Sequence, residues 1–497
     1  MTEEGISRPV SALIAAFLLA IIHQYLFYGK LAGVSYPIFV SLFYIFMLYY
    51  AKDKIRKPTG FSYILLGVIA LLSLTNALFH NWFFFGLNLL VIPVLIILHM
   101  TYMLSDKRPS WSGIGIIGNA LEHFFPQTLR HWNTVLTIVK KTSGRKLQNE
   151  RKQVLVKVLI GLAISFPLLL IVISLLSSAD GVFKHILNEF PTLLDRISFG
   201  EGLVRVLWVV VLGLGFFGLV WGFVDSKIYN WTLPQPNESE LELEPTTFKV
   251  DPVIITTILV AINTVYVLFV FVQFSYLFGA WEGILPADSS YADYARSGFF
   301  ELIMVTAINF VILMLALLSS EKGNLLLHRI IKVLLYVLVG CSTVMLYSAY
   351  TRLTLYEQAY GYTYIRFLVH SFMIFLALLL CLAAIRISKK EFPLAKCYIV
   401  LGLLSYVVMN YIGMDVIIAN NNIDRYEVSS NIDAAYLSRL SPEAIPTLIS
   451  FSRKEGGLLD SNLRDELVDF RKKERSWQSF NVSEYRAERA LERYFRE

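Results

Sequence analysis

The stretch FLVHSFMIFLALLLCLAAI, residues 367–385, decides the fold class of this chain. It contains no Asp, Glu, Lys or Arg. As an α-helix it extends roughly 28 Å, at about 1.5 Å per residue, which is close to the thickness of the hydrocarbon core of a bilayer. A helix satisfies its own backbone hydrogen bonds in lipid. This stretch is therefore predicted to cross a membrane.

Ten more apolar stretches of similar length surround it. Together they predict an all-α fold, a polytopic transmembrane helical bundle of about eleven spans. The expected spans are residues 9–29, 31–51, 61–79, 83–104, 153–176, 203–224, 253–279, 299–319, 329–350, 364–386 and 395–418.

The composition supports this class of protein. The 497 residues are 56% hydrophobic and 14% aromatic, and only 16% are charged, whereas a soluble chain carries about 25% charged residues. The net charge of +6 comes mostly from loops, so it indicates topology and not a nucleic-acid partner. The three cysteines, Cys341, Cys381 and Cys397, lie in or beside expected spans and predict neither a disulfide framework nor a zinc site.

The distribution of Lys and Arg predicts the orientation in the membrane. If the N-terminus is inside, the inner loops hold most of the basic residues, and the loop 105–152 is the richest. The positive-inside rule therefore predicts an inner N-terminus, and an odd number of spans then leaves the C-terminus outside. The basic residues of the outer loops are Lys30, Lys184, Arg196, Arg296 and Arg352.

Four parts follow from this map: an N-terminal four-span unit (1–104), a cytoplasmic basic loop (105–152), a seven-span core (153–419) and a small extracytoplasmic helical tail (420–497). The cytoplasmic loop is expected to form amphipathic helix, interrupted at Pro126, on the inner leaflet and against anionic lipid headgroups.

The tail is expected to form several helices. Ser441 precedes Pro442 and Glu443, which is typical of an N-cap before a proline at the first helical position. Ser461 and Ser483 are expected to cap two later helices, and the charged last helix is expected to be loosely held. The tail is the candidate binding site for an envelope protein partner.

Ionisable residues enter the expected spans at one end. Under the topology above, all of them lie at the outer ends of their helices. Such charges are costly in lipid unless they are paired or wetted, so they predict a paired or ligand-binding polar cluster; the alternative for each residue is a side chain that reaches the interface by itself. The candidates are Asp180, Arg205, Glu301, Arg352, Glu357, Arg366 and Asp415.

The segment RLTLYEQAYGYTYIR, residues 352–366, stands out within this set. Its arginine forks suit a carboxylate or a phosphate, including a lipid headgroup, and its tyrosines are equally typical of an aromatic belt. Elsewhere, Gly218 and Gly222 form G-x-x-x-G, which favours close packing against another span of the same chain over a dimer interface.

The chain resembles a bacterial family of polytopic membrane proteins, the domain of unknown function 4153/4173 type. The resemblance covers most of the chain from about residue 150 onward. It rests on SSADGVF (177–183), YTRLTLYEQAYGYTYIR (350–366), MDVIIANNNIDRY (414–426) and DAAYLSRLSPEAIPTL (433–448). Family members usually have proline where this chain has Gly181, which puts a rigid turn there in doubt. The resemblance implies a bacterial cell membrane and a helical multi-span fold, and it brings no activity.

Two classes of function remain open. The absence of recognised catalytic, metal-ligand and cofactor motifs favours a non-enzymatic envelope scaffold, regulator or ligand-binding protein without a cofactor. The alternatives are a transporter, although the sequence has no clear repeat, and an envelope enzyme that acts on a lipid-linked substrate. In the enzyme, Asp180, Glu301, Glu357 or Asp415 would serve as acid or base, and Arg352 and Arg366 would hold a phosphate.

Overall fold

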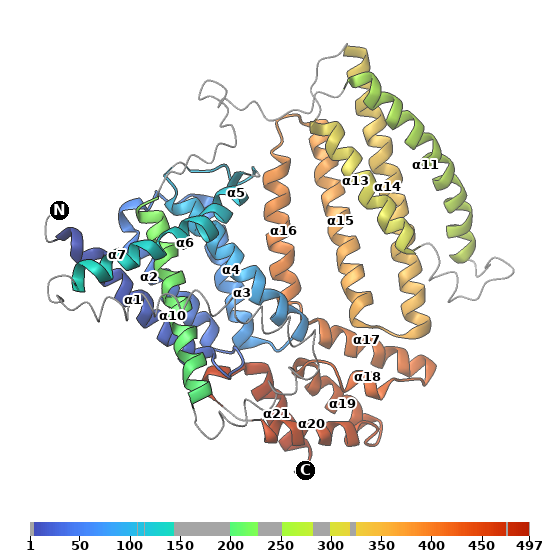
Figure 1. Cartoon of the computed structure of the whole chain (residues 1–497). Helices are drawn as coiled ribbons and strands as arrows, with labels where there is room; N and C mark the ends of the chain where they lie inside the picture. Colours follow the sequence, from blue (N-terminus) through green and yellow to red (C-terminus); the bar gives the residue numbers. More distant parts are fainter. Residues whose placement is uncertain are drawn as a thin grey trace, which may run out of the picture. The chain divides into compact units, whose positions relative to one another are not determined.

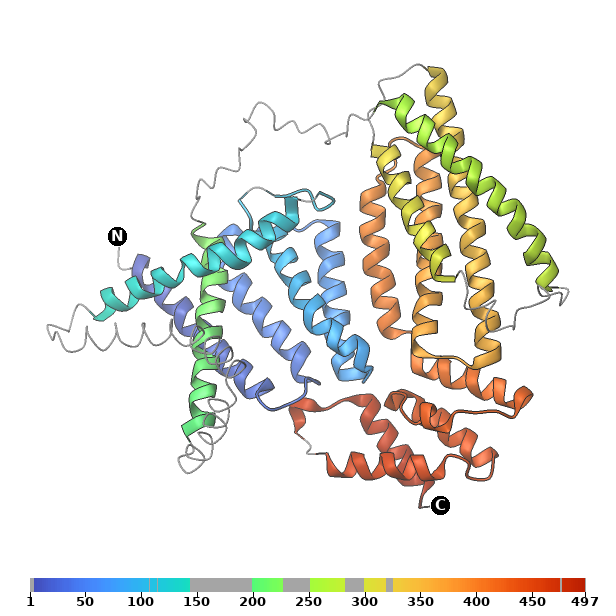
Figure 2. The same ribbon diagram turned by 45° about the vertical axis from the view of Figure 1, so that its right-hand side comes forward.

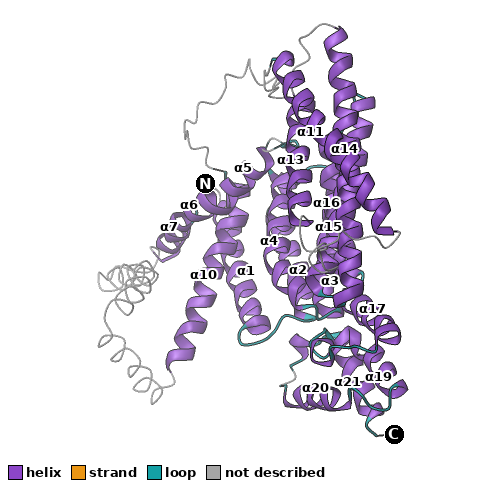
Figure 3. Ribbon diagram, turned by 90° about the vertical axis from the view of Figure 1, so that its right-hand side faces the viewer, coloured by secondary structure: helices purple, strands orange, loops and turns teal. Residues whose placement is uncertain are grey.

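The computed structural model describes residues 4–106, 108–113, 115–143, 199–226, 251–281, 299–318, 325–473 and 476–496. Every regular element in these ranges is helical (Figure 3). The expected span 153–176 and Asp180 lie outside the described residues. Where the chain is described, it forms two compact units, one of residues 1–77, 89–229 and 475–480, the other of 78–88, 230–474 and 481–497.

Eight of the described helices are long and apolar enough to cross a membrane, which confirms that this is a multi-pass membrane protein. They are α1 (Glu4–Phe27), α3 (Gly60–Leu78), α4 (Trp82–Leu104), α10 (Phe199–Val224), α11 (Pro252–Trp281), α14 (Leu325–Tyr360), α15 (Tyr364–Ser388) and α16 (Leu394–Tyr411). Two shorter apolar stretches occupy expected spans, namely α2 (Ser35–Tyr50) and Ile303–Leu317 of α13 (Phe299–Leu318). The total of eleven spans stays a prediction.

In the first unit, glycines of α10 allow neighbouring segments to pack closely against this helix. Helices α1 and α10 pack along each other, and a Cβ at Gly213 of α10 would lie 2.9 Å from the Phe17 ring of α1. A Cβ at Gly218 would lie 2.4 Å from the backbone oxygen of Thr128. Gly218 and Gly222 of α10 therefore pack within the chain, as the sequence favours, but they approach Thr128 and Gln127 of the loop between α4 and α10 and not another span.

That loop is helical where it is described: α5 (Gly115–Glu122), η2 (His123–Gln127), α6 (Thr128–Arg130) and α7 (Trp132–Ser143). The break expected at Pro126 is absent. Pro126 instead lies within η2, a single π-helical turn. A proline lacks the amide hydrogen and crowds the preceding turn, and a wider π turn relieves both problems without ending the helix.

The second unit contains a bundle of α11, α13, α14 and α15, whose helices pack side by side (Figure 2). Its core is almost entirely aliphatic, with Leu338, Met345 and Leu380 among its most buried side chains. Helix α14 has 36 residues and is about 54 Å long at 1.5 Å per residue. It therefore exceeds the hydrocarbon thickness and continues past the expected end at residue 350.

The expected last span, 395–418, is two helices. Helix α16 ends at Tyr411, and α17 begins at Met414 and runs to Ser429. Gly413 between them has a φ of +69°, a left-handed conformation that side chains other than glycine rarely adopt. The apolar sequence continues through this break, which is why hydropathy placed the boundary several residues too late.

The C-terminal helices form a second core within this unit. They are α17, α18 (Ala434–Leu437), η4 (Pro442–Ala444), α19 (Ile445–Lys454), α20 (Asp460–Lys472) and α21 (Val482–Tyr494) (Figure 1). Leu448, Leu463 and Leu491 are fully or almost fully buried in it. The last helix is therefore packed, and the expectation that it is loosely held is wrong.

One of the three expected helix caps is at its position. Ser441 precedes η4, with Pro442 in the first turn. The residue at the N-cap of α20 is Leu459 and not Ser461. Asn481, and not Ser483, caps α21, because its Oδ1 accepts the amide hydrogens of Ser483 and Glu484.

Candidate functional site

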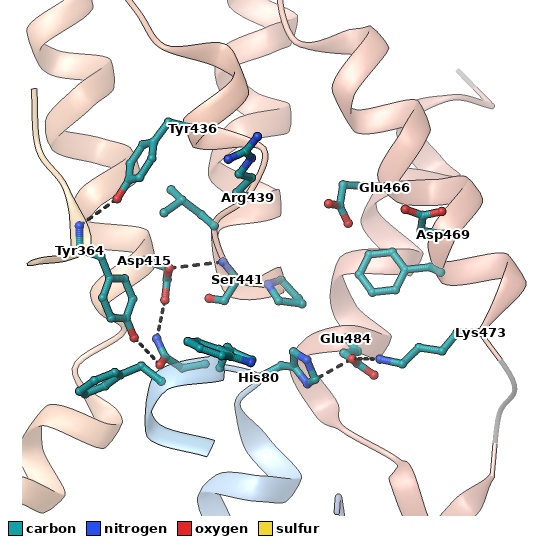
Figure 4. Close-up of a pocket in the computed structure, with 16 residues that line it drawn as sticks. His80, Tyr364, Asp415, Tyr436, Arg439, Ser441, Glu466, Asp469, Lys473 and Glu484 are labelled. Carbon is teal, nitrogen blue, oxygen red and sulfur yellow. Dashed lines mark hydrogen bonds and ion pairs between the residues drawn. The ribbon is translucent and has the colours of Figure 1, made fainter. Parts of the chain in front are cut away.

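A pocket of about 560 Å³ opens in the second unit. Its walls come from the α3–α4 turn, the start of α15, the start of α17, the segment between α18 and η4, and helices α20 and α21 (Figure 4). The described residues that line it are His80, Asn81, Trp82, Phe83, Tyr364, Asp415, Tyr436, Arg439, Leu440, Ser441, Pro442, Glu466, Asp469, Phe470, Lys473 and Glu484.

Asp415 lies on the floor of this pocket. It lies in the first turn of α17 and is 4% exposed. Its Oδ2 accepts a hydrogen bond of 2.7 Å from Nδ2 of Asn81, and its Oδ1 accepts one of 3.3 Å from the Ser441 amide. Burial raises the pKa of the Asp415 carboxyl, the nearby Glu443 raises it further, and the hydrogen bonds partly oppose both effects.

Asn81 links Asp415 to α4 and to the first residue of α15. Its Oδ1 accepts a hydrogen bond from the Tyr364 hydroxyl (2.5 Å) and another from the Phe84 amide (3.1 Å). The Tyr364 amide in turn donates to the Tyr436 hydroxyl at 2.9 Å. The floor is therefore a hydrogen-bonded network that fixes the orientation of each polar group.

The turn between α3 and α4 is held by the C-terminal helices. The His80 amide donates to Oε1 of Glu443 at 2.5 Å, and the Phe79 carbonyl accepts from Nδ2 of Asn481 at 2.7 Å. Glu484 lies between two basic groups, 3.2 Å from Nδ1 of His80 and 2.5 Å from Nζ of Lys473. One wall is thus an ion-paired contact between this turn and α21.

Charges of opposite sign stand on facing walls. The exposed Arg439 follows α18, and the half-buried Glu466 and exposed Asp469 lie on α20 across the pocket (Figure 4). Burial is the main cause that raises the pKa of the Glu466 carboxyl, and the neighbouring Asp469 and Asp465 add to it. Two opposite charges that do not meet each other leave room for a ligand between them.

The rim is aromatic. Trp82, in the first turn of α4, is 83% exposed, and the Phe83 ring stands edge-on to Tyr364 with ring centroids 5.9 Å apart. Tyr364 is the first residue of α15, and α16 ends at Tyr411, four residues before Asp415. Aromatic residues at the ends of spans are typical of the membrane–water interface, which places the pocket at that depth.

A family described as "Domain of unknown function (DUF4153)" matches residues 66–451. The chain belongs to this DUF4153 family. The resemblance found in the sequence is thereby confirmed. No curated protein and no solved structure matches the chain.

Two of the segments that resemble DUF4153 members bind each other. In the α14–α15 turn, Gly361 has a φ of +85°. Asn422 of α17 pairs with the backbone of the next residue, accepting from the Tyr362 amide at 3.0 Å and donating to its carbonyl at 2.9 Å. Arg425 donates to the carbonyls of Gln358 and Ala359 at 2.9 and 2.8 Å, the last carbonyls of α14. These segments therefore join α17 to the spans.

Two arginines of the predicted cluster do not line the pocket. Arg366 donates to the Gly361 carbonyl and lies over the Tyr356 ring, 4.2 Å from its centroid. Arg205 belongs to α10 of the first unit and lies over the Tyr28 ring.

Glu357 is an acidic member of the cluster with a partner of its own outside the pocket. Glu357 is 4% exposed, and its Oε2 lies 2.9 Å from Nε2 of His370. Glu301 lies on α13, but its side chain is outside the description, as is the whole of Asp180. Of the predicted residues whose side chains are described, Asp415 lines this pocket, and Arg205, Arg352, Glu357 and Arg366 do not.

Most of the pocket was missed by reasoning from the sequence. His80 and Asn81 are two polar residues in a short turn, and Arg439, Glu466 and Lys473 belong to a tail that looks like ordinary charged helix. The available signal was Asp415, a short acidic side chain beside apolar sequence that cannot reach water by itself. Its partners lie 334 and 26 residues away in the chain, so no local pattern reveals them.

Proposed function

We propose that this DUF4153 protein is a non-enzymatic, ligand-binding protein of a bacterial cell membrane that acts as an envelope regulator or scaffold. One observation carries the proposal: the walls of the 560 Å³ pocket come both from the ends of candidate spans and from the C-terminal helices. A ligand there touches both parts at once. Its binding energy therefore stabilises one arrangement of the C-terminal helices on the spans.

The proposed orientation places the N-terminus inside and the C-terminus outside. The Lys and Arg of the inner loops support it, and with it the α3–α4 turn and the start of α15 face outward. The pocket then opens on the outer face, and α18 to α21 are available to an envelope partner. The basic loop around α7 remains on the inner face, against anionic lipid headgroups.

Site-specific crosslinking tests the ligand site. A photo-reactive phenylalanine analogue replaces Trp82 in the full chain, the cells are irradiated, and the purified protein is weighed intact. We expect a discrete added mass below that of a protein. The matched control carries the same analogue at Trp208, which is 39% exposed on α10. Identical adducts at both positions, or none at Trp82, would refute the ligand site.

A reporter tests the orientation. Alkaline phosphatase folds only outside the cytoplasm, so its fusion after Phe495 is expected to be active. A fluorescent reporter that needs the cytoplasm is expected to be dark at the same position. The reverse pair of results would place the pocket on the inner face.

An envelope enzyme that acts on a lipid-linked substrate is the second candidate. Burial of Asp415 favours it, because the burial raises the pKa of the carboxyl, which is the direction that suits a general acid. The Asp415→Asn variant distinguishes the two proposals. A ligand-binding protein continues to give the crosslinked adduct of unchanged mass, whereas an enzyme accumulates a heavier, unprocessed substrate at Trp82.

A further inference from the structure

The charges around the pocket divide into those with partners and those without. Asp415 accepts hydrogen bonds from Asn81 and Ser441, and Glu484 is shared by His80 and Lys473. The guanidinium of Arg439 makes no hydrogen bond or ion pair with any residue that the structure describes, and the same is true of the carboxyl of Glu466. Asp469 has a single contact, at 3.7 Å with the exposed Lys472.

The acidic and basic groups that face the pocket stand opposite one another. Arg439 lies on the wall formed by the segment after α18, and Glu466 and Asp469 project from α20 on the facing wall (Figure 4). Glu466 is half-buried, so its carboxyl gains from a partner, whereas Arg439 and Asp469 are exposed and accessible to a ligand. A single ligand satisfies both walls only if it carries a cation and an anion.

We propose that the pocket binds a zwitterionic headgroup in which a primary ammonium and a phosphate are joined by a short linker, as in phosphoethanolamine. The ammonium donates to Glu466 and Asp469, and the phosphate accepts from Arg439. An arginine fork matches phosphate oxygens, and a primary ammonium has three hydrogens for carboxylate oxygens. This inference rests on the proposed function, since it names the ligand class of the same site.

The size and depth of the site favour the lipid form of this chemistry. A volume of about 560 Å³ lies in the range of small-molecule sites and exceeds the headgroup itself. Leu440, Phe83 and Phe470 add apolar wall, which suits the glycerol backbone and the first carbons of the acyl chains. The pocket also lies beside the first turn of α15, where the headgroups of a bilayer are found.

Native mass spectrometry of the full-length protein tests this inference. The protein is released from detergent after equilibration with phosphatidylethanolamine, phosphatidylcholine or phosphatidylglycerol, or with soluble phosphoethanolamine. We expect phosphatidylethanolamine to bind most tightly. Arg439→Gln and Glu466→Gln should each weaken its binding about tenfold, the loss of one charge-assisted hydrogen bond. The controls Arg471→Gln and Asp424→Asn, exposed charges outside the pocket, should leave it unchanged.

The outcomes separate the sources and the two proposals. Binding of the lipid without the soluble headgroup identifies the membrane as the source, and comparable binding of both identifies a free zwitterion. If phosphatidylglycerol and phosphatidylethanolamine bind equally well, and only Arg439→Gln weakens their binding, the site binds an anion and the proposal of a zwitterionic ligand is wrong. If none of the four probes binds and Trp82 still captures an adduct, this inference fails alone. If Trp82 captures nothing either, the proposed function fails too.

Discussion

The Asn481 side chain tests how the C-terminal helices are attached to the turn before α4. It makes two separate sets of interactions. Its Oδ1 caps α21 through the amides of Ser483 and Glu484 at 2.9 and 3.3 Å, and its Nδ2 donates to the Phe79 carbonyl at 2.7 Å. The residue is only 5% exposed, so water does not readily replace either set.

The expected cost follows from these contacts. Loss of an N-cap costs about 1 kcal/mol, and a buried carbonyl left without its donor costs roughly 1–3 kcal/mol. Asn481→Ala therefore removes about 2–4 kcal/mol of stability from α21 and its contact with the turn. Asn481→Ser keeps an acceptor for the cap and loses only the bond to Phe79, so its cost should be about 1–3 kcal/mol, which is about 1 kcal/mol less than that of Asn481→Ala.

Hydrogen exchange measures this directly. The protected amides of α21 in the wild-type protein and the two variants give the free energy of local opening. The matched control is Ser483→Ala, the residue that the sequence indicated as the cap. It is expected to cost less than about 0.5 kcal/mol, because its hydroxyl donates to Oδ1 of Asn481 and caps no amide. If Ser483→Ala costs as much as Asn481→Ala, the assignment of the cap is wrong.

Three other predictions concern the pocket and the packing of the spans. The raised pKa of Asp415 means that the folded state binds the proton of this carboxyl more tightly than the unfolded state does. The free energy of unfolding should therefore fall as pH rises from about 4. Asp415→Asn should flatten this dependence in chemical unfolding measured between about pH 4 and 8. Gly361→Ala forces a side chain into a φ of +85° and places its Cβ 2.9 Å from Oδ1 of Asn422, which should cost at least roughly 1–2 kcal/mol. An unchanged melting temperature would contradict the left-handed conformation of Gly361. Gly218→Ala places a Cβ 2.4 Å from a backbone oxygen, whereas Gly215→Ala meets nothing within 4 Å; the first should lower the folded yield on size-exclusion chromatography, and equal yields would contradict the close packing.

The sequence by itself determined the fold class and most helices. Lipid imposes a local requirement, about 20 apolar residues in a helix, and that requirement is visible in any window of the chain. The stretch around residues 364–386 is therefore recognisable without knowledge of its neighbours. The family was recognisable too, because its motifs are contiguous.

Only the tertiary structure decided where α16 stops and what surrounds Asp415. The break at Gly413 depends on backbone conformation within an apolar run, so hydropathy does not reveal it. The partners of Asp415 come from the α3–α4 turn and from the segment before η4. A buried carboxylate is satisfied by whichever donors the fold brings to it, and side chains hundreds of residues apart carry no shared local pattern. The sequence therefore indicated Asp415 of the predicted cluster and the segment that contains Tyr364, and only folding brought them together with the other residues of the pocket.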